Sequence, residues 1–381
     1  MTSLKTTPLT TWHEDHGARM VPFAGYTMPV QYEGVLAEHA AVRERVGLFD
    51  ITHMGEVYVG GPDAEQWISG LITNRIDGIA PGKVVYTTMC NERGGCLDDM
   101  LVYRLDGERW LIVMNAANHA KIAAWLRSHL PPRGVTLDDA SDRTGLIAVQ
   151  GPDSRELMGR LGQLRSAAAA IAALEFYTHF RSAGPGGEWI VSRTGYTGEH
   201  GYELYLPVSD MLPVWQELVA KGGDLGVAPI GLAARDTLRF EAGYCLYGHE
   251  LSEDWTPLEA GVGWAVKLKK PGGFIGSEAL AALKAAGLPR RLLGLEVLGG
   301  PLAREGSPVL AGERKVGHVT SGTFAPTLAR KLAIALVDAA YAEADLTVDV
   351  RGKRLATRPV ALPFLAARVK GDPRAERTQS W

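Results

Sequence analysis

The feature that most restricts the fold is a strand–turn–helix unit that occurs twice. A strand-like run leads into Gly-Pro-Asp at 56–63 (EVYVGGPD). The same sequence pattern occurs again ninety residues later, at 146–153 (LIAVQGPD). Asp63 and Asp153 are favourable N-cap residues, each with a Gln or Glu three positions later, so a helix is predicted to begin after each. The repeat predicts two related α+β halves, although Gly-Pro-Asp also begins helices in unrelated proteins.

Other segments extend this pattern. Apolar spacing predicts a helix over 33–47 with Gly47 as its stop, and an apolar surface helix over 163–174. Strands grouped with flanking helices, rather than alternating strictly with them, favour the α+β class. From about 290 the chain breaks into short strands with Gly/Pro turns, which is typical of a small β-barrel or sandwich.

Composition sets the broad class. A chain of 381 residues with 46 % apolar and 22 % charged residues is expected to form two or three globular domains. The net charge of −3 gives no basic field that would favour nucleic acid or an anionic membrane. The first 20 residues lack the apolar core of a secretory signal, and no apolar run is long enough to span a membrane. Cys90, Cys96 and Cys245 form no CxxC pair, so we expect a cytoplasmic protein whose cysteines are unreactive.

Several common enzyme signatures do not occur. The chain has no G-x-x-x-x-G-K-[ST] loop, no complete G-x-G-x-x-G, no H-E-x-x-H and no G-x-S-x-G, and its histidines show no metal-ligand spacing. We therefore expect no metal, no flavin and no nicotinamide cofactor.

Two acidic segments are candidates for ligand chemistry. Asp98 and Asp99 enter an apolar strand, where neighbouring side chains point to opposite faces, so one carboxylate can face solvent and the other inward. In 194–203 (TGYTGEHGYE), glycines let the backbone approach a flat ligand, Tyr196 offers a stacking face, and Glu203 can accept two N–H bonds. A turn-closing Asp pair and a hairpin with a surface Glu are the plain alternatives.

Two further segments carry unexpected polar residues. Arg235 and Arg239 share one helical face, which is usually a solvated ion-pair face, although small neighbours of Arg235 indicate close packing. His53 and Met54 separate a helix from a strand and could line a pocket, while a core histidine bonded to backbone is the alternative.

Read in order, these segments resemble one family, the glycine cleavage system T-protein, a folate-dependent aminomethyltransferase. The resemblance covers roughly residues 7–366 and rests on an opening at 7–32 and on five motifs: FDITHMGE (49–56), YTTMCNERGGCLDDMLVY (86–103), GYTGEHGYE (195–203), GLAARDTLRFEAGYCLYGHEL (231–251) and TSGTFAPTL (320–328).

The resemblance implies an α+β fold of three domains in a cloverleaf-like arrangement around a folate cavity. Two related α+β domains, the first of them discontinuous and the second inserted in it, precede a C-terminal β-barrel. The expected bounds are 1–52 with 141–270, 53–140, 285–370, and a flexible tail at 371–381.

The implied reaction moves a one-carbon unit from the lipoyl arm of H-protein to tetrahydrofolate and releases ammonia and 5,10-methylenetetrahydrofolate. By motif position, Asp99 and Arg235 are the expected catalytic residues; the residues alone did not choose between Asp98 and Asp99. Expected folate contacts are Met54, Tyr86, Leu101, Tyr103, Val113, Asn115, Tyr196, Glu203, Trp264 and, from the C-terminal domain, Arg368.

Two alternatives share the implied fold. One is a folate-dependent demethylase that acts on a small methylated substrate. The other is a non-catalytic folate-binding protein of iron–sulfur assembly, whose relatives carry a Cys in a K-G-C-Y-x-G-Q-E-like run, near Cys245 here. The presence of Asp99 and of the Ala-Arg-Asp helix favours the aminomethyltransferase.

Overall fold

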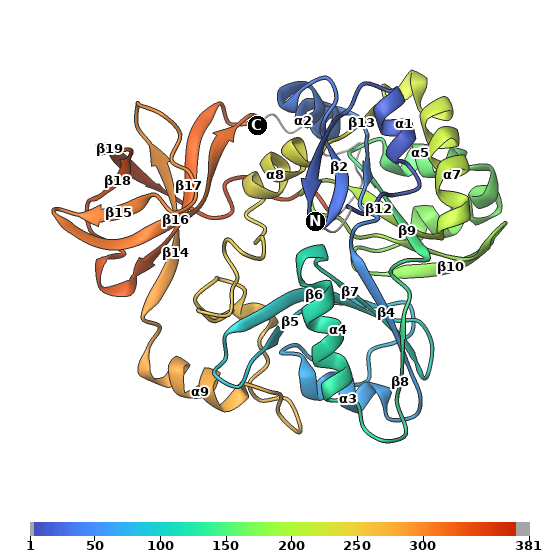
Figure 1. Ribbon diagram of the computed structural model, residues 1–381, viewed down its shortest axis with the longest axis horizontal. Helices are drawn as coiled ribbons and strands as arrows, with labels where there is room; N and C mark the ends of the chain where they lie inside the picture. Colours follow the sequence, from blue (N-terminus) through green and yellow to red (C-terminus); the bar gives the residue numbers. More distant parts are fainter. Residues whose placement is uncertain (1–3, 371–381) are drawn as a thin grey trace.

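A computed structural model describes residues 4–370, and three of its sheets surround a central region (Figure 1). The expected tail at 371–381 lies outside the described residues. The first of the three sheets has six strands. Neighbouring strands are antiparallel, except that the short strand at one edge runs parallel to its neighbour. Its spatial order is β10 (His179–Gly184), β11 (Gly187–Ser192), β12 (Gly201–Pro207), β9 (Thr144–Gln150), β3 (Gly47–Asp50) and β13 (Ala228–Pro229).

The second sheet has five antiparallel strands and comes from the chain between β3 and β9. Its spatial order is β5 (Val84–Cys90), β6 (Cys96–Arg104), β7 (Arg109–Met114), β4 (Gly55–Gly60) and β8 (Thr136–Asp139). Helices α3 (Ala64–Leu71) and α4 (His119–Ser128) accompany it. The chain thus leaves the first sheet after β3, completes the second, and returns at β9.

The two sheets repeat one topology, as the double Gly-Pro-Asp unit predicts. A first strand (β4 or β9) leads into a helix (α3 or α5, Ser154–Arg160) and then into a three-stranded meander whose last strand pairs with the first. A helix follows each meander, α4 or α7 (Val208–Lys221). Gly61 and Gly151 turn the chain in the two copies with φ of 114° and 125°, a region that favours glycine.

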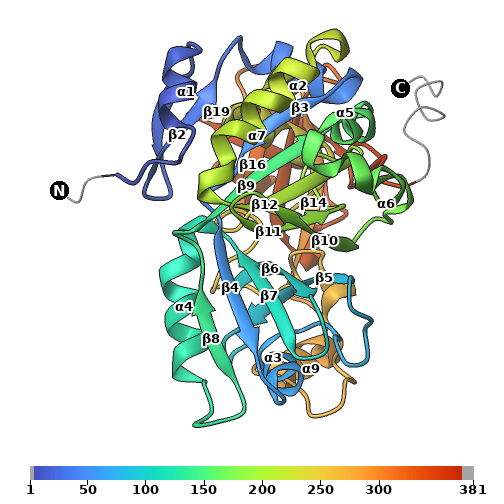
Figure 2. The same cartoon turned by 90° about the vertical axis from the view of Figure 1, so that its right-hand side faces the viewer.

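Each of the two sheets has helices against one face, and the remaining faces meet each other. α5 and α7 pack on the first sheet, and α3 and α4 on the second, in separate apolar cores. A third core joins the bare faces, with Phe49 and Ala148 from one sheet and Leu111 and Val113 from the other. Figure 2 shows the two sheets one above the other. Strand alternation therefore directs every second residue of β6 and β7 toward the first sheet.

The C-terminal segment forms a closed six-stranded barrel, as the β-rich end of the chain predicts. Its order is β14 (Arg290–Val297), β17 (Arg330–Asp338), β16 (Arg314–Ala325), β15 (Pro308–Ala311), β18 (Leu346–Val350) and β19 (Lys353–Val360). Helix α9 (Ser277–Ala286) precedes it, and α8 (Leu232–Glu241) packs between the barrel and the six-stranded sheet (Figure 1). The remaining elements near the N-terminus are α1 (Thr10–Asp15), the ribbon β1 (Arg19–Phe23) with β2 (Tyr26–Gln31), and α2 (Val35–Glu44).

Three local predictions were wrong in detail. The helix expected to stop at Gly47 ends at Glu44, and Gly47 begins β3, where a Cβ would lie 2.5 Å from Ile230. The segment expected as one helix over 163–174 is a 3₁₀ helix (Gly162–Ala167) followed by α6 (Ala168–Ala173). Neither Asp63 nor Asp153 caps its helix through its side chain, because both have near-helical ψ of 3° instead of the extended backbone that such a cap needs.

Candidate ligand-binding cavity

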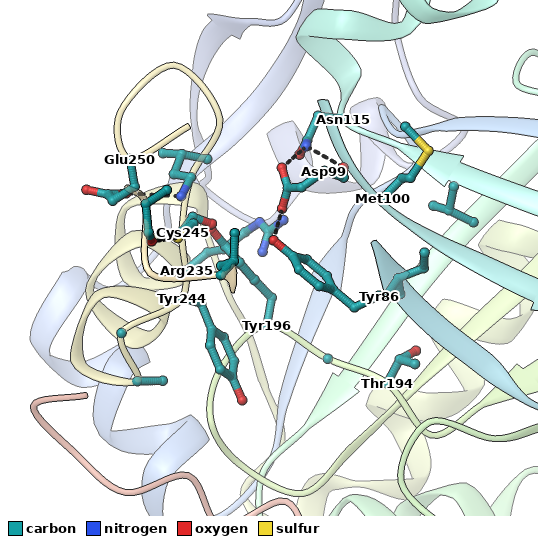
Figure 3. Close-up of a pocket in the computed structure, with 18 of the residues that line it drawn as sticks. Tyr86, Asp99, Met100, Asn115, Thr194, Tyr196, Arg235, Tyr244, Cys245 and Glu250 are labelled. Atoms are coloured by element: carbon teal, nitrogen blue, oxygen red, sulfur yellow. Dashed lines mark hydrogen bonds between the residues drawn. The ribbon is translucent and has the colours of Figure 1, made fainter. Parts of the chain in front are cut away.

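A cavity of about 560 Å³ lies where the two sheets, α8 and the barrel meet, a volume within the ~300–1,000 Å³ common for small-molecule sites. Figure 3 shows part of its lining. All but two of the predicted site residues line it: Met54, Tyr86, Asp99, Leu101, Val113, Asn115, Tyr196, Glu203, Arg235 and Trp264. Because these residues lie far apart in the sequence, only the packing of the folded chain brings them together.

One wall is a row of side chains across the second sheet. Tyr86 of β5 pairs with Leu101 of β6, and Leu101 pairs with Val113 of β7, so the three share one face. Trp264, in the 3₁₀ turn Gly263–Ala265, stacks on Tyr86 with ring centroids 5.3 Å apart and remains 58 % exposed. The row forms a flat apolar surface with one accessible aromatic ring at its end.

Asp99 places a carboxylate in this cavity. The Tyr86 hydroxyl donates to Oδ2 at 3.0 Å, and the Asn115 amide donates to Oδ1 at 2.8 Å (Figure 3). Burial raises the pKa of Asp99 to about 6, while these two donors act in the opposite direction. The carboxylate is thus oriented by neutral donors and carries a negative charge at neutral pH.

Asp98 points to the opposite face of β6, so one carboxylate of the pair faces the cavity and the other faces the interior. Asp98 is 0 % exposed, since Asn115 and Asn118 close over it at the end of β7. The structure therefore resolves the open choice geometrically: Asp99, not Asp98, lines the cavity.

Glu203 supplies a second carboxylate from β12. Its Oε2 accepts a hydrogen bond from the Thr194 hydroxyl. Burial raises the pKa of Glu203 above its ordinary value, while hydrogen bonds from the Thr194 and Tyr205 side chains act in the opposite direction. A carboxylate in an aromatic cavity can accept further hydrogen bonds from a flat nitrogen-rich ring.

Arg235 contributes a cation from α8. Its guanidinium lies 4.3 Å from the ring centroid of Tyr196, and within residues 4–370 no hydrogen bond or ion pair reaches it. The neighbouring Arg239 behaves differently, because Glu250 at 3.0 Å and Asp236 at 2.7 Å hold it in a buried position. The structure therefore does not have the solvated ion-pair face that was the alternative reading of this helix, and Arg235 remains available to a negatively charged or electron-rich group.

Tyr103 and Arg368 do not line the cavity. Tyr103 is fully buried in the core between the two sheets, with its hydroxyl 2.8 Å from that of Tyr205. Arg368 binds Glu199 at 2.8 Å and the Arg43 carbonyl at 3.1 Å, because its backbone is held to Gly198. Both support neighbouring segments in this structure.

The glycines of 194–203 serve packing more than ligand approach. A Cβ on Gly195 or Gly201 would lie 2.0 or 2.2 Å from the Gln150 side chain. Gln150 in turn donates to the carbonyls of Thr194 and Tyr202. The glycines therefore leave space for the Gln150 side chain and its hydrogen bonds. Similarly, His53 is a buried core histidine against Phe23, and only Met54 reaches the cavity.

Sequence reasoning missed a group of lining residues that come from other parts of the chain. They are Tyr177, Tyr205, Tyr244, Cys245, Glu250, Leu292, Ile334, Leu362 and Pro363. Leu292 and Ile334 belong to the barrel. The sequence predicted the alternation of residues along these strands, but it did not indicate which face of the barrel packs against the cavity. Burial raises the pKa of the Cys245 thiol well above its ordinary value, consistent with an unreactive cysteine.

Glu56 of β4 is a buried acid opposite Val113, and neither carboxyl oxygen has a hydrogen-bond partner within residues 4–370. Burial, and then the charge of Asp139, raises its pKa well above 4.5. The folded chain therefore keeps a proton that the unfolded chain releases above about pH 4.5, so this group lowers stability by about 1.4 kcal/mol per pH unit until its folded pKa is reached.

We expect Glu56→Gln to remove this slope, so that the variant gains stability relative to the wild type between pH 5 and pH 8. Urea unfolding of both chains at the two pH values measures the change. Glu278→Gln, at an exposed position of α9, is the matched control and should show no pH-dependent difference. If the free energies of unfolding of the wild type and the variant differ by the same amount at pH 5 and at pH 8, Glu56 is not held as a neutral acid in the folded chain.

The fold and the cavity define a class: an α+β protein with a repeated sheet unit and a C-terminal barrel. Its cavity is largely apolar and contains the carboxylates of Asp99 and Glu203 and the Arg235 guanidinium, which has no ion pair within the described residues. The family models agree with this class, since the GCVT N-terminal domain matches residues 9–270 and the glycine cleavage T-protein C-terminal barrel domain matches 290–365. The chain belongs to the glycine cleavage T-protein family.

Relatives extend the similarity over nearly the full length. A protein of Desulforamulus reducens named aminomethyltransferase is 44 % identical over 96 % of this chain and 99 % of its own length. One of Halothermothrix orenii with the same name is 42 % identical over 95 % of this chain and 100 % of its own. The crystal structure of glycine cleavage system aminomethyltransferase T from Bartonella henselae superposes with a TM-score of 0.88 at 34 % identity, covering 96 % and 99 % of the two chains.

Among residues 4–370, no three or more His, Cys, Asp or Glu side chains gather in a way that could hold a metal ion. In the same part of the chain, no helix has the length and apolar content needed to cross a membrane.

Proposed function

We propose that this chain is the aminomethyltransferase of a glycine cleavage system, which moves a one-carbon unit from the aminomethyl-dihydrolipoyl arm of H-protein to tetrahydrofolate. Ammonia and 5,10-methylenetetrahydrofolate are released, and the arm is left as the dithiol. The observation that carries the proposal is the cavity itself, because one apolar site contains an oriented carboxylate, Asp99, a second acceptor, Glu203, and the unpaired cation of Arg235.

The residues present fit tetrahydrofolate as the acceptor. Glu203 would accept N–H bonds from the amino-pyrimidine edge, and the Tyr86–Leu101–Val113 row would lie against the ring. Trp264 and Tyr196 extend the aromatic wall. The substrate supplies the nucleophilic nitrogens; the protein supplies the acceptors that fix their orientation.

Asp99 and Arg235 are the proposed catalytic residues. Asp99, held by Tyr86 and Asn115, would face the nitrogens that form the new C–N bonds and stabilise positive charge that develops there as ammonia leaves. Because these donors fix the carboxylate beforehand, little reorganisation is needed during the reaction. Arg235, at 4.3 Å from Tyr196, would offset the negative charge of the dihydrolipoyl sulfur that the transfer frees.

The proposed domains follow the sheets. Residues 1–52 with 141–270 hold the six-stranded sheet, 53–140 hold the five-stranded sheet, and 285–370 hold the barrel. The proposed partner is lipoylated H-protein, and the exposed Trp264 marks an edge of the cavity open to its arm. The free thiols of all three cysteines accord with a proposed cytoplasmic location.

A reconstituted assay tests the function. Mixing the protein, tetrahydrofolate and aminomethylated H-protein should release ammonia at a rate that saturates with H-protein. Omission of tetrahydrofolate should lower the rate sharply. Ammonia release no faster than without the protein would overturn the proposal. Saturation by a small methylated amine but not by H-protein would instead favour the demethylase, and folate binding without turnover of either would favour a non-catalytic role.

A further inference from the structure

Asp98 has no place in the cavity, yet it touches the residue that orients Asp99. It is 0 % exposed on the helix-facing side of β6. Its Oδ2 accepts the backbone N–H of Asn115 at 3.1 Å, and its Oδ1 accepts the side-chain amides of Asn115 at 2.9 Å and Asn118 at 2.6 Å. Three N–H donors thus converge on this carboxyl, two of them from Asn115.

Asn115 is the link between the two acids. Its side-chain nitrogen also lies 2.8 Å from Asp99 Oδ1 and 3.0 Å from the Asp99 carbonyl. A single amide therefore contacts both carboxyl groups, although they point to opposite faces of the strand. The other Asp99 oxygen accepts from Tyr86, so loss of the Asn115 contact would leave the carboxylate with one side-chain donor in the part of the chain that the structure describes.

We propose that Asp98 is a positioning residue for the transfer reaction: it holds Asn115 in the one orientation in which its amide fixes the Asp99 carboxylate. This inference rests on the proposed function. Asp98 touches neither the cavity nor the reacting atoms, so its effect passes through Asn115.

Two opposing effects act on the ionisation of Asp98. Burial, and then the charge of Asp99, raises the pKa of Asp98, whereas the hydrogen bonds from Asn115 and Asn118 act in the opposite direction. Three converging N–H donors favour the ionised form, which is the form that can hold Asn115 through accepted hydrogen bonds. The other titratable groups facing Asp98 are Cys96 and Tyr247, and Lys121 binds the Tyr247 hydroxyl at 2.7 Å.

The first test is Asp98→Asn in the reconstituted assay. The new amide must turn its NH₂ toward at least one of the converging donors, which releases Asn115. We expect kcat for ammonia release to fall roughly ten- to hundredfold, because a displaced carboxylate no longer meets the reacting atoms. The dissociation constant of tetrahydrofolate should stay close to that of the wild type, since Glu203 and the apolar walls are unchanged. Asp345→Asn, exposed before β18, is the matched control.

A double-mutant cycle separates positioning from a general packing defect. If Asp98 acts through Asn115, then adding Asp98→Asn to Asn115→Ala should cause no further loss of kcat. Losses that multiply in the double variant, or a loss that appears in tetrahydrofolate binding and not in kcat, would overturn the proposal.

Asn118→Ala covers the case in which Asp98→Asn does not fold. It keeps both carboxyls and Asn115 but removes one donor that holds Asp98, so kcat should fall by a smaller factor with tetrahydrofolate binding retained. An unchanged kcat would count against the proposal. Wild-type chain is assayed alongside: an inactive wild type overturns the proposed function and this inference together, whereas an active wild type with equally active Asp98 variants overturns this inference alone.

Discussion

Asp99→Asn should lower kcat for ammonia release by about 10²–10⁴-fold while tetrahydrofolate still binds. The asparagine loses the negative charge that faces the developing positive charge. It also replaces one acceptor oxygen by an NH₂ donor, which cannot accept the hydrogen bond from Tyr86 or from Asn115. The wild-type kcat should be full above the Asp99 pKa of about 6 and fall as pH drops through it, because the acid is active when ionised. The variant should lack this acid limb.

Steady-state ammonia release between pH 5 and pH 8 measures both effects. Titration with tetrahydrofolate should give a dissociation constant within a few-fold of the wild type, which also shows that the variant is folded. Asp345→Asn removes a carboxylate from an exposed position and should match the wild type throughout. A variant with near-normal kcat, or with the same acid limb, would show that Asp99 is not the group that acts.

Glu203→Gln should weaken tetrahydrofolate binding by roughly ten- to hundredfold. This is the loss of affinity expected when one charge-assisted hydrogen bond is removed from a buried site. Glutamine has one acceptor oxygen where glutamate has two, and the Thr194 hydroxyl already donates to one carboxylate oxygen of Glu203. Its NH₂ would then face the N–H groups of the ring. We expect a rise in the dissociation constant with a much smaller change in kcat at saturation.

Equilibrium titration followed by fluorescence of the cavity aromatics, which include Trp264 stacked on Tyr86, provides the measurement. Glu278→Gln on α9 is the charge-matched control and should bind as the wild type does. Unaltered affinity in Glu203→Gln would place the pyrimidine edge elsewhere in the cavity. A loss in kcat alone would instead assign Glu203 to the chemistry.

Local patterns in the chain predicted much of the fold. The two Gly-Pro-Asp units identified a repeat that the structure contains as two sheets of one topology, because turn chemistry and strand alternation are properties of neighbouring residues. The β-rich end similarly predicted the barrel. Cap geometry at Asp63 and the end of α2 were missed, since contacts with distant segments set the backbone there.

By itself, then, the sequence determined the element types, the repeat and the family motifs that mark Asp99, Glu203 and Arg235. Only the tertiary structure decided which acid faces the cavity, because that depends on which face of β6 packs against α3 and α4. It also decided that Tyr103 is buried between the two sheets and that Arg368 binds Glu199. The physical reason is the same in each case: a side chain's role follows from the surfaces that pack around it, and those come from segments far away in the chain.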